Sequence, residues 1–172
     1  MQAVIRPALP GDATAIASVG RESFTWAFGH LYEEGTLARY LEATYATAKI
    51  ASSLEKPANT YFVAELDGRV RGFLKLKEAC PHPSVTGPGT PWQTQKLYVD
   101  PSLLRAGLGR RLMDAGEAWM RTRGAGSTWL VVYEGNDSAI RFYETLGFRQ
   151  VGVEFHDFER LRVAFKLMEK RL

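Results

Sequence analysis

The segment from Leu97 to Arg111 constrains the fold of this chain more than any other stretch. It starts as an apolar strand that stops at Asp100-Pro101, passes through a turn with Gly107 and Gly109, and continues as a helix. A strand that ends just before a helix begins implies a layered fold in which helices pack on a sheet. The main-chain N–H groups at such a helix start have no partner inside the helix. The segment therefore also predicts an anion-binding site.

The rest of the chain alternates between strand and helix patterns. We expect strands at residues 3–6, 61–66, 70–77, 93–99, 129–133, 150–158 and 161–168, and helices at residues 11–28, 33–54 (one or two), 107–122 and 138–146. Asp67-Gly68 predicts a tight turn, and the apolar run at 129–133 is typical of a central strand buried on both faces. These elements predict an α/β (α+β layered) fold with one central mixed sheet, in a single domain over residues 1–172.

Composition excludes several classes of protein. Cys80 is the only cysteine among 172 residues, so no internal disulfide is expected and a cytoplasmic location is favoured. No apolar run approaches the ~20 residues of a membrane span, and residues 1–10 lack the apolar block of a secretory signal. A net charge of +3 suits an anionic ligand but does not indicate nucleic acid, and the three histidines show no metal-ligand spacing.

Arginines surround the glycine turn. Arg105, Arg110 and Arg111 lie at the positive end of the predicted helix, where each cation destabilises by roughly 0.3–1 kcal/mol unless an anion binds there. The turn is not a Walker loop, because no Gly-Lys-Ser/Thr is present, and Leu112 replaces the third glycine of the dinucleotide fingerprint. The alternative interpretation is an ordinary solvated helix start whose glycines only form the turn.

A second helix start lies at Asn136. Asn136 is a good N-cap residue, and Gly147 can take the left-handed conformation that ends a helix. Ala139 and Tyr143 fall at helical spacing between them. Taken alone, this segment could be a short amphipathic helix with the Tyr143 hydroxyl at its rim.

Together the two motifs resemble those of the GNAT superfamily of acyl-CoA-dependent N-acyltransferases. The pyrophosphate motif of that family, Gln/Arg-x-x-Gly-x-Gly/Ala, falls on residues 104–109, and its Asn-x-x-Ala-x-x-Phe-Tyr-x-x-x-Gly-Phe motif falls on residues 136–148. Leu104 replaces the usual Gln or Arg, which we expect to weaken a flanking contact without abolishing the site. The resemblance implies a mostly antiparallel, twisted sheet flanked by helices, with a splayed strand pair that forms the acyl-CoA cleft.

The resemblance also implies acetyl-CoA as co-substrate and assigns residues to it. The pantetheine arm would pair with the backbone of Leu97 and Val99, and an N–H group near Val99 would stabilise the acetyl carbonyl. The full set of residues that the resemblance places at the coenzyme is Leu97, Tyr98, Val99, Arg105, Ala106, Gly107, Leu108, Gly109, Arg110, Asn136, Ala139 and Tyr143.

Two residues are candidates for proton transfer. An alkylamine has a pKa of about 10.4, so less than about one molecule in a thousand is neutral and nucleophilic at neutral pH. Glu134 is the candidate base, directly or through water; alternatively it is a surface carboxylate. Tyr143 is the candidate acid for the departing thiolate. Because a phenol near pKa 10 is a weaker acid than a thiol near 8.5, Tyr143 needs a lowered pKa or contributes mainly a hydrogen bond.

The acceptor is less well defined by the sequence. A looser resemblance to bacterial spermidine/spermine N-acetyltransferases, at residues 24–32, 40–41, 72–76 and 129–136, suggests a small-molecule amine, with a polyamine as one candidate. An acceptor site covered by residues 33–54 would favour small amines, whereas an open groove would favour a protein N-terminus or lysine. A non-catalytic acyl-CoA-binding regulatory module is the other alternative. No metal, nucleic-acid or membrane partner is expected, and a homodimer is compatible with the sequence.

Overall fold

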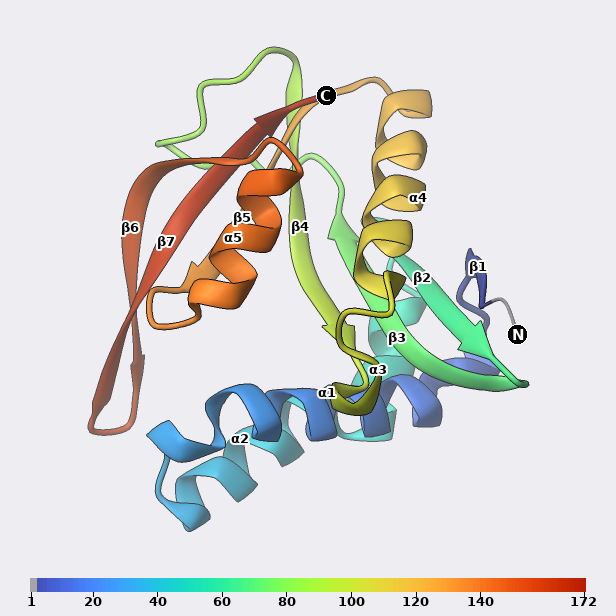
Figure 1. Cartoon of the computed structure of the whole chain (residues 1–172), viewed down its shortest axis with the longest axis vertical. Coiled ribbons are helices and arrows are strands. Elements are labelled where there is room, and N and C mark those ends of the chain that lie inside the picture. Colours follow the sequence, from blue (N-terminus) through green and yellow to red (C-terminus); the bar gives the residue numbers. More distant parts are fainter. Residues whose placement is uncertain (1–2) are drawn as a thin grey trace. The chain divides into compact units, whose positions relative to one another are not determined.

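The computed structural model describes residues 3–172, which form a seven-stranded sheet with flanking helices (Figure 1). The strands are β1 (Val4–Pro7), β2 (Asn59–Leu66), β3 (Arg69–Lys77), β4 (Thr90–Val99), β5 (Ala125–Tyr133), β6 (Arg149–Phe158) and β7 (Leu161–Arg171). The α-helices are α1 (Ala13–Phe28), α2 (Glu34–Tyr45), α3 (Thr47–Leu54), α4 (Leu108–Thr122) and α5 (Asp137–Thr145). Short 3-10 helices are η1 (Pro10–Asp12), η2 (Gly29–Leu31) and η3 (Pro101–Leu103).

The strand order in the sheet is β1-β2-β3-β4-β5-β7-β6. Strands β4 and β5 run parallel, whereas the pairs β1–β2, β5–β7 and β6–β7 are antiparallel. The mixed sheet expected from the sequence is therefore confirmed. The predicted tight turn is confirmed as well, since Asp67 and Gly68 both have positive φ, at 54° and 72°, as a two-residue hairpin turn requires.

The chain divides into two compact units, each assembled from two stretches of sequence. The first contains Met1–Leu76 and Lys96–Ala118, and the second contains Lys77–Gln95 and Trp119–Leu172. The division falls within β4 and within α4, so both elements contribute to both units.

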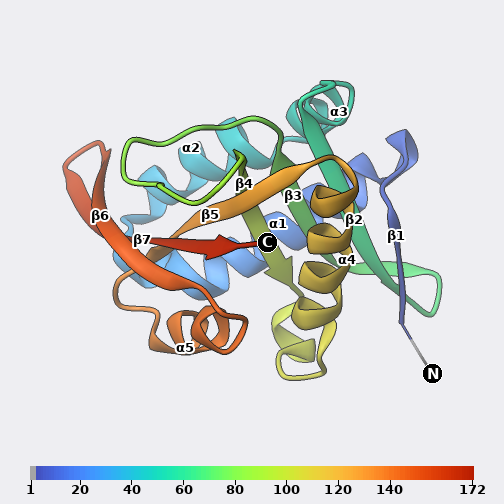
Figure 2. The same cartoon turned by 90° about the horizontal axis from the view of Figure 1, so that it is seen from above.

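In the first unit, β3 separates two layers of side chains. Phe73 is fully buried in a cluster with residues of α1 and α3. Its neighbours Leu74 and Leu76 point the other way, against Gly116 of α4, where a larger side chain would collide with Leu74. Helices α1 and α4 therefore cover opposite faces of β2 and β3 (Figure 2). The period-two alternation of β3 produces this arrangement.

Helices α2 and α3 form the predicted helical stretch over residues 33–54, and extended backbone at Ala46 separates them. Tyr45, the last residue of α2, is fully buried and lies against Gly20 of α1. The rings of Phe24 and Tyr40 stack with centroids 4.5 Å apart. Aromatic contacts thus attach α2 to α1.

In the second unit, β5 is the central strand, and most of its residues are buried. The segment between β3 and β4 packs on this part of the sheet, since the Trp129 indole donates to the Cys80 carbonyl at 2.7 Å. Farther along, the N–H of Gly87 donates to the buried carboxylate of Glu169. We expected the strand after this segment to start at residue 93, but β4 begins at Thr90 because its first residues pair with β5.

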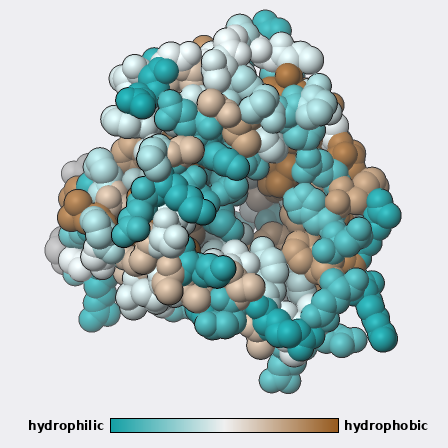
Figure 3. Space-filling view, turned by 180° about the vertical axis from the view of Figure 1, so that it is seen from behind, coloured by the Kyte–Doolittle hydropathy of each residue, from teal (hydrophilic) through white to brown (hydrophobic). Residues whose placement is uncertain are grey.

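Within the described residues, no helix is both long and apolar enough to cross a membrane. On the face that Figure 3 shows, hydrophobic residues are interspersed with hydrophilic ones. Exposed large hydrophobic side chains include Val4 of β1, Trp26 of α1, Trp119 of α4 and Phe155 of β6. They therefore lie on several different elements.

Candidate active site

The anion turn, which we define as residues 104–109, lies between η3 and the first residues of α4, in the first unit. Arg105 has φ of 73° and Gly107 has φ of 79°, both left-handed. Nothing lies within 4 Å of the position that a Cβ at Gly107 would occupy, so this part of the turn is open. A left-handed arginine is uncommon, and such backbone conformations concentrate at functional turns.

The first amides of α4 are available to a ligand. The N–H of Arg111 donates to the carbonyl of Gly107 at 3.1 Å, so the amides of Leu108, Gly109 and Arg110 precede the first helical hydrogen bond. The first turn of α4 contains no acidic residue. The positive end of the helix dipole therefore faces outward without a compensating charge from its own first turn.

Within residues 3–172, no carboxylate forms an ion pair with Arg105, Arg110 or Arg111. Unpaired guanidinium groups around free helical amides fit a polyanion such as the pyrophosphate of coenzyme A. The interpretation as an ordinary solvated helix start does not explain why these cations gather at its positive end.

Leu97, Tyr98 and Val99 form the end of β4, which belongs to the first unit. The pairing register of β4 with β5 runs from Thr90 opposite Ala125 to Gln93 opposite Trp129, and β4 continues beyond it to Val99. This arrangement is consistent with the splayed strand pair that the resemblance implies. The Val99 carbonyl accepts a hydrogen bond from Ser23 Oγ at 3.0 Å, which ties this end of β4 to α1.

In the second unit, the start of α5 is capped as the sequence predicts. Asn136 Oδ1 accepts a hydrogen bond from the N–H of Ala139 at 3.1 Å, and Asp137 lies in the first helical turn. Gly147 ends the helix with φ of 92°. Because the cap engages the Asn136 oxygen and the Ala139 amide, other atoms of these residues would have to contact a coenzyme.

Tyr143 on α5 packs between Phe142 and Phe148, with ring centroids 5.3 and 5.7 Å away. Burial raises the pKa of the Tyr143 phenol above its ordinary value. The direction of this change favours the second possibility left by the sequence, a hydrogen bond, over a lowered pKa. With a raised pKa the phenol stays protonated at neutral pH and can donate a hydrogen bond.

Glu134 follows the last residue of β5, and its side chain is exposed. Its main-chain N–H donates to the carbonyl of Ala164 at 3.1 Å, which fixes the backbone of the turn. The position agrees with the predicted strand end. In this structure the carboxylate lies in solvent.

The structure also brings together residues that the sequence left apart. In the second unit, Glu154 contacts both His82, at 2.6 Å, and His156, at 3.1 Å. No group of three or more His, Cys, Asp or Glu side chains in the described part of the chain could hold a metal ion. Separation in sequence hid this cluster, since His82 and His156 come from different elements.

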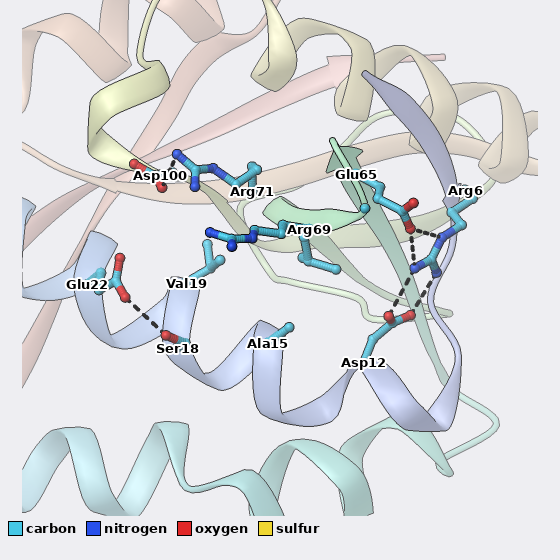
Figure 4. A pocket seen from close by; sticks show the side chains of 12 residues that line it. Arg6, Asp12, Ala15, Ser18, Val19, Glu22, Glu65, Arg69, Arg71 and Asp100 are labelled. Carbon is cyan, nitrogen blue, oxygen red and sulfur yellow. Dashed lines mark hydrogen bonds and ion pairs between the residues drawn. The ribbon is translucent and has the colours of Figure 1, made fainter. Parts of the chain in front are cut away.

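A cavity of about 410 Å³ lies in the first unit, lined by residues of β1, α1 and β3 (Figure 4). Arg6 lies between Asp12 and Glu65, 2.8 Å from each, and its guanidinium lowers the pKa of Asp12. Arg71 pairs with Asp100 at 3.0 Å. Two of these ion pairs, Arg6–Glu65 and Arg71–Asp100, join elements that are distant in sequence, which indicates a structural role.

The chain matches the sequence profile of the acetyltransferase (GNAT) family over residues 21–148. It belongs to this family. The enzyme is thus an acetyl-CoA-dependent N-acetyltransferase, and the family resemblance noted from its two motifs is confirmed.

Known relatives agree with the family. The enzyme is 28% identical over 137 residues to an uncharacterized N-acetyltransferase of Lactobacillus delbrueckii subsp. lactis (79% of this chain, 78% of the relative). It is 22% identical over 151 residues to the spermidine N(1)-acetyltransferase of Thermoplasma acidophilum (86% and 88%). The crystal structure of the PaiA N-acetyltransferase from that organism, in complex with coenzyme A, superposes with a TM-score of 0.81 at 22% identity over 100% of both chains.

Proposed function

We propose that this GNAT enzyme transfers the acetyl group of acetyl-CoA to the primary amine of a small molecule. The observation that carries the coenzyme part of this proposal is the anion turn. Its arginines have no carboxylate partner within residues 3–172, and the amides that follow precede the first hydrogen bond of α4. A bound pyrophosphate would supply negative charge to the arginines and hydrogen-bond acceptors to these amides.

Each part of the coenzyme has a proposed set of residues. The pyrophosphate would lie on Arg105, Arg110 and the amides of Ala106, Gly107, Leu108 and Gly109. The pantetheine arm would pair with the main chain of Leu97, Tyr98 and Val99. Asn136, Ala139 and Tyr143 would contact the thioester end. Acetyl-CoA supplies an activated acyl group and a thiolate leaving group.

The remaining chemistry is proton transfer by side chains. The acceptor ammonium must lose a proton before it attacks, and we assign that proton to Glu134, directly or through water. Because Glu134 is exposed, a water chain is the more natural route. Tyr143 donates a hydrogen bond to the departing sulfur, in agreement with the raised pKa of its phenol.

The packing of α2 and α3 supports a small acceptor. The segment from residue 33 to 54 lies over β4 in the first unit, where the buried Tyr45 side chain accepts a hydrogen bond from Lys96 at 3.3 Å. Cover of this kind over the acceptor site would favour small amines over a peptide, and this supports the proposal. A polyamine is a further candidate, supported by the loose sequence resemblance and by the spermidine-acetylating relative.

An acetyl-transfer screen tests the proposal. Release of coenzyme A thiol would be measured with polyamines, amino acids, aminoglycosides and short peptides, each against a blank without amine. We expect release above the blank with one or more small amines. Release with peptides alone would instead show a protein or peptide acetyltransferase.

A further inference from the structure

Lys96, on β4, is a partly buried cation that the proposed mechanism does not use. Its Nζ donates to the Tyr45 hydroxyl at 3.3 Å and lies 4.8 Å from the centroid of the same ring. Tyr45 is fully buried, so it holds the ammonium in a fixed position. Sequence patterns gave no indication of this contact, which joins residues far apart in the chain.

No carboxylate in the described part of the chain pairs with Lys96. A second cation, Lys75 of β3, acts electrostatically on Lys96, and its own Nζ lies 5.7 Å from the centroid of the Tyr61 ring. Burial, followed by repulsion from Lys75, lowers the pKa of Lys96 to about 8. Buried charges in proteins are normally paired. Lys96 has no carboxylate partner in the described residues, and Lys75 on the adjacent strand adds positive charge, so an external anion would be stabilised beside the Lys96 Nζ.

The position of Lys96 relates the Lys96 cluster, which consists of Lys96, Tyr45 and Lys75, to the proposed reaction. Lys96 directly precedes Leu97–Val99, the stretch that we assign to the pantetheine arm. Tyr98 meets Tyr45 edge-on, with ring centroids 6.1 Å apart, so both residues lie on the α1 face of this end of β4. Val99 instead lies beside Gly72 and Leu112, on the α4 face. A molecule on the α1 face would therefore meet Lys96.

We infer that Lys96, assisted by the charge of Lys75, binds a carboxylate of the acceptor, so that the substrate is an amine that also carries a carboxylate, such as an amino acid. The inference rests on the proposed function. An ammonium has three N–H donors, and Tyr45 takes one from Lys96. The remaining two match the two oxygens of one carboxylate. A polyamine would instead bring a second ammonium toward two lysines, so the cluster disfavours that candidate.

Matched acceptor pairs test the inference. Ornithine and putrescine, lysine and cadaverine, and tyrosine and tyramine each differ by one carboxylate. Thiol release gives kcat/KM for every member, and spermidine serves as the polyamine reference. We expect the carboxylate-bearing member of at least one pair to be preferred at least tenfold.

Substitutions at Lys96 assign that preference to its side chain. Lys96→Met should reduce the preference at least tenfold, mainly through KM of the carboxylate-bearing member, and Lys96→Arg should restore part of it. Lys49→Met, which removes an exposed lysine from α3, is the matched control and should leave the preference unchanged. Equal ratios in wild type and Lys96→Met would overturn the inference.

The two proposals fail in different ways. If the decarboxylated amines or spermidine are the better substrates, the enzyme is still a small-amine acetyltransferase and only the carboxylate site is wrong. If no small amine in the panel causes thiol release, both the proposed function and the carboxylate site are wrong. As a readout without turnover, calorimetry with N-acetylornithine should show at least tenfold weaker binding to Lys96→Met than to wild type. Equal binding to both proteins would contradict the carboxylate site.

Discussion

The starts of α4 and α5 carry the two motifs of the family, yet they are built in opposite ways. The start of α5 is satisfied from within, because Asn136 caps the Ala139 amide and Asp137 adds a negative charge to the first turn. The start of α4 has no acid in its first turn and is surrounded by arginines without a carboxylate partner in residues 3–172. A helix start that compensates its own dipole stabilises the fold, whereas one that accumulates positive charge depends on a ligand.

The largest effect should follow charge reversal at α4. Arg105→Glu with Arg110→Glu removes the two charge-assisted contacts that we propose and adds two repulsive ones, so we expect acetyl-CoA to bind roughly a hundredfold or more weakly. Calorimetric titration measures the change. Arg149→Glu, which reverses the charge of an exposed arginine at the start of β6, is the matched control. If the double variant binds acetyl-CoA as tightly as this control does, the start of α4 is not the coenzyme site.

An intermediate effect is expected at Tyr143 of α5. Tyr143→Phe removes a hydrogen-bond donor and should lower kcat by roughly 10- to 100-fold at saturating acceptor. Because burial raises the pKa of the phenol, Tyr143 remains protonated throughout the neutral and mildly alkaline range. The shape of the pH profile of kcat should therefore be the same in wild type and variant. An alkaline limb near pH 8–9 that disappears in the variant would show that Tyr143 titrates in this range.

A smaller effect, on stability, should distinguish the start of α5. Asn136→Ala leaves the Ala139 amide without its cap, and we expect the free energy of unfolding to fall by about 1 kcal/mol. Urea denaturation of the enzyme without coenzyme measures this, and Asn136→Asp should retain most of the stability. The exposed Ser138→Ala serves as control. No difference between Asn136→Ala and this control would mean that the cap does not stabilise the helix.

The smallest effect has the opposite sign. Arg110→Gln removes a cation from the positive end of α4, so the enzyme without coenzyme should gain roughly 0.3–1 kcal/mol of stability. With saturating acetyl-CoA the variant should lose this advantage, because it binds the ligand less tightly. Thermal unfolding with and without acetyl-CoA tests the reversal. A variant that is less stable in both states would contradict the contrast between the two helix starts.

The two helix starts were predictable from sequence because each depends on residues close together in the chain. Gly107 and Gly147 mark their turns, and Asn136 is a cap by residue type and position. Helix α1 began later than expected, at Ala13, since Pro10–Asp12 form a 3-10 turn. Patterns of this kind reveal local conformation and the family that shares it.

The Lys96 cluster could not be predicted in this way. Lys96 meets Tyr45 because the end of α2 packs on β4, and Lys75 becomes its neighbour through the sheet order. Neither contact follows from a recognisable spacing of residues in the sequence, because each joins residues that are far apart in the chain. The direction of the pKa change at Tyr143 was also open, because it depends on how much of the ring its surroundings cover.

The left-handed backbone at Arg105 limits how this turn can change. Glycine would relieve a conformational cost on the order of 1–2 kcal/mol there, but it would remove a guanidinium from the proposed coenzyme site. At this position, the residue that gives the highest stability without coenzyme therefore differs from the residue that favours coenzyme binding. Replacing Arg105 with glycine should therefore yield a protein that is more stable to heat but binds acetyl-CoA more weakly.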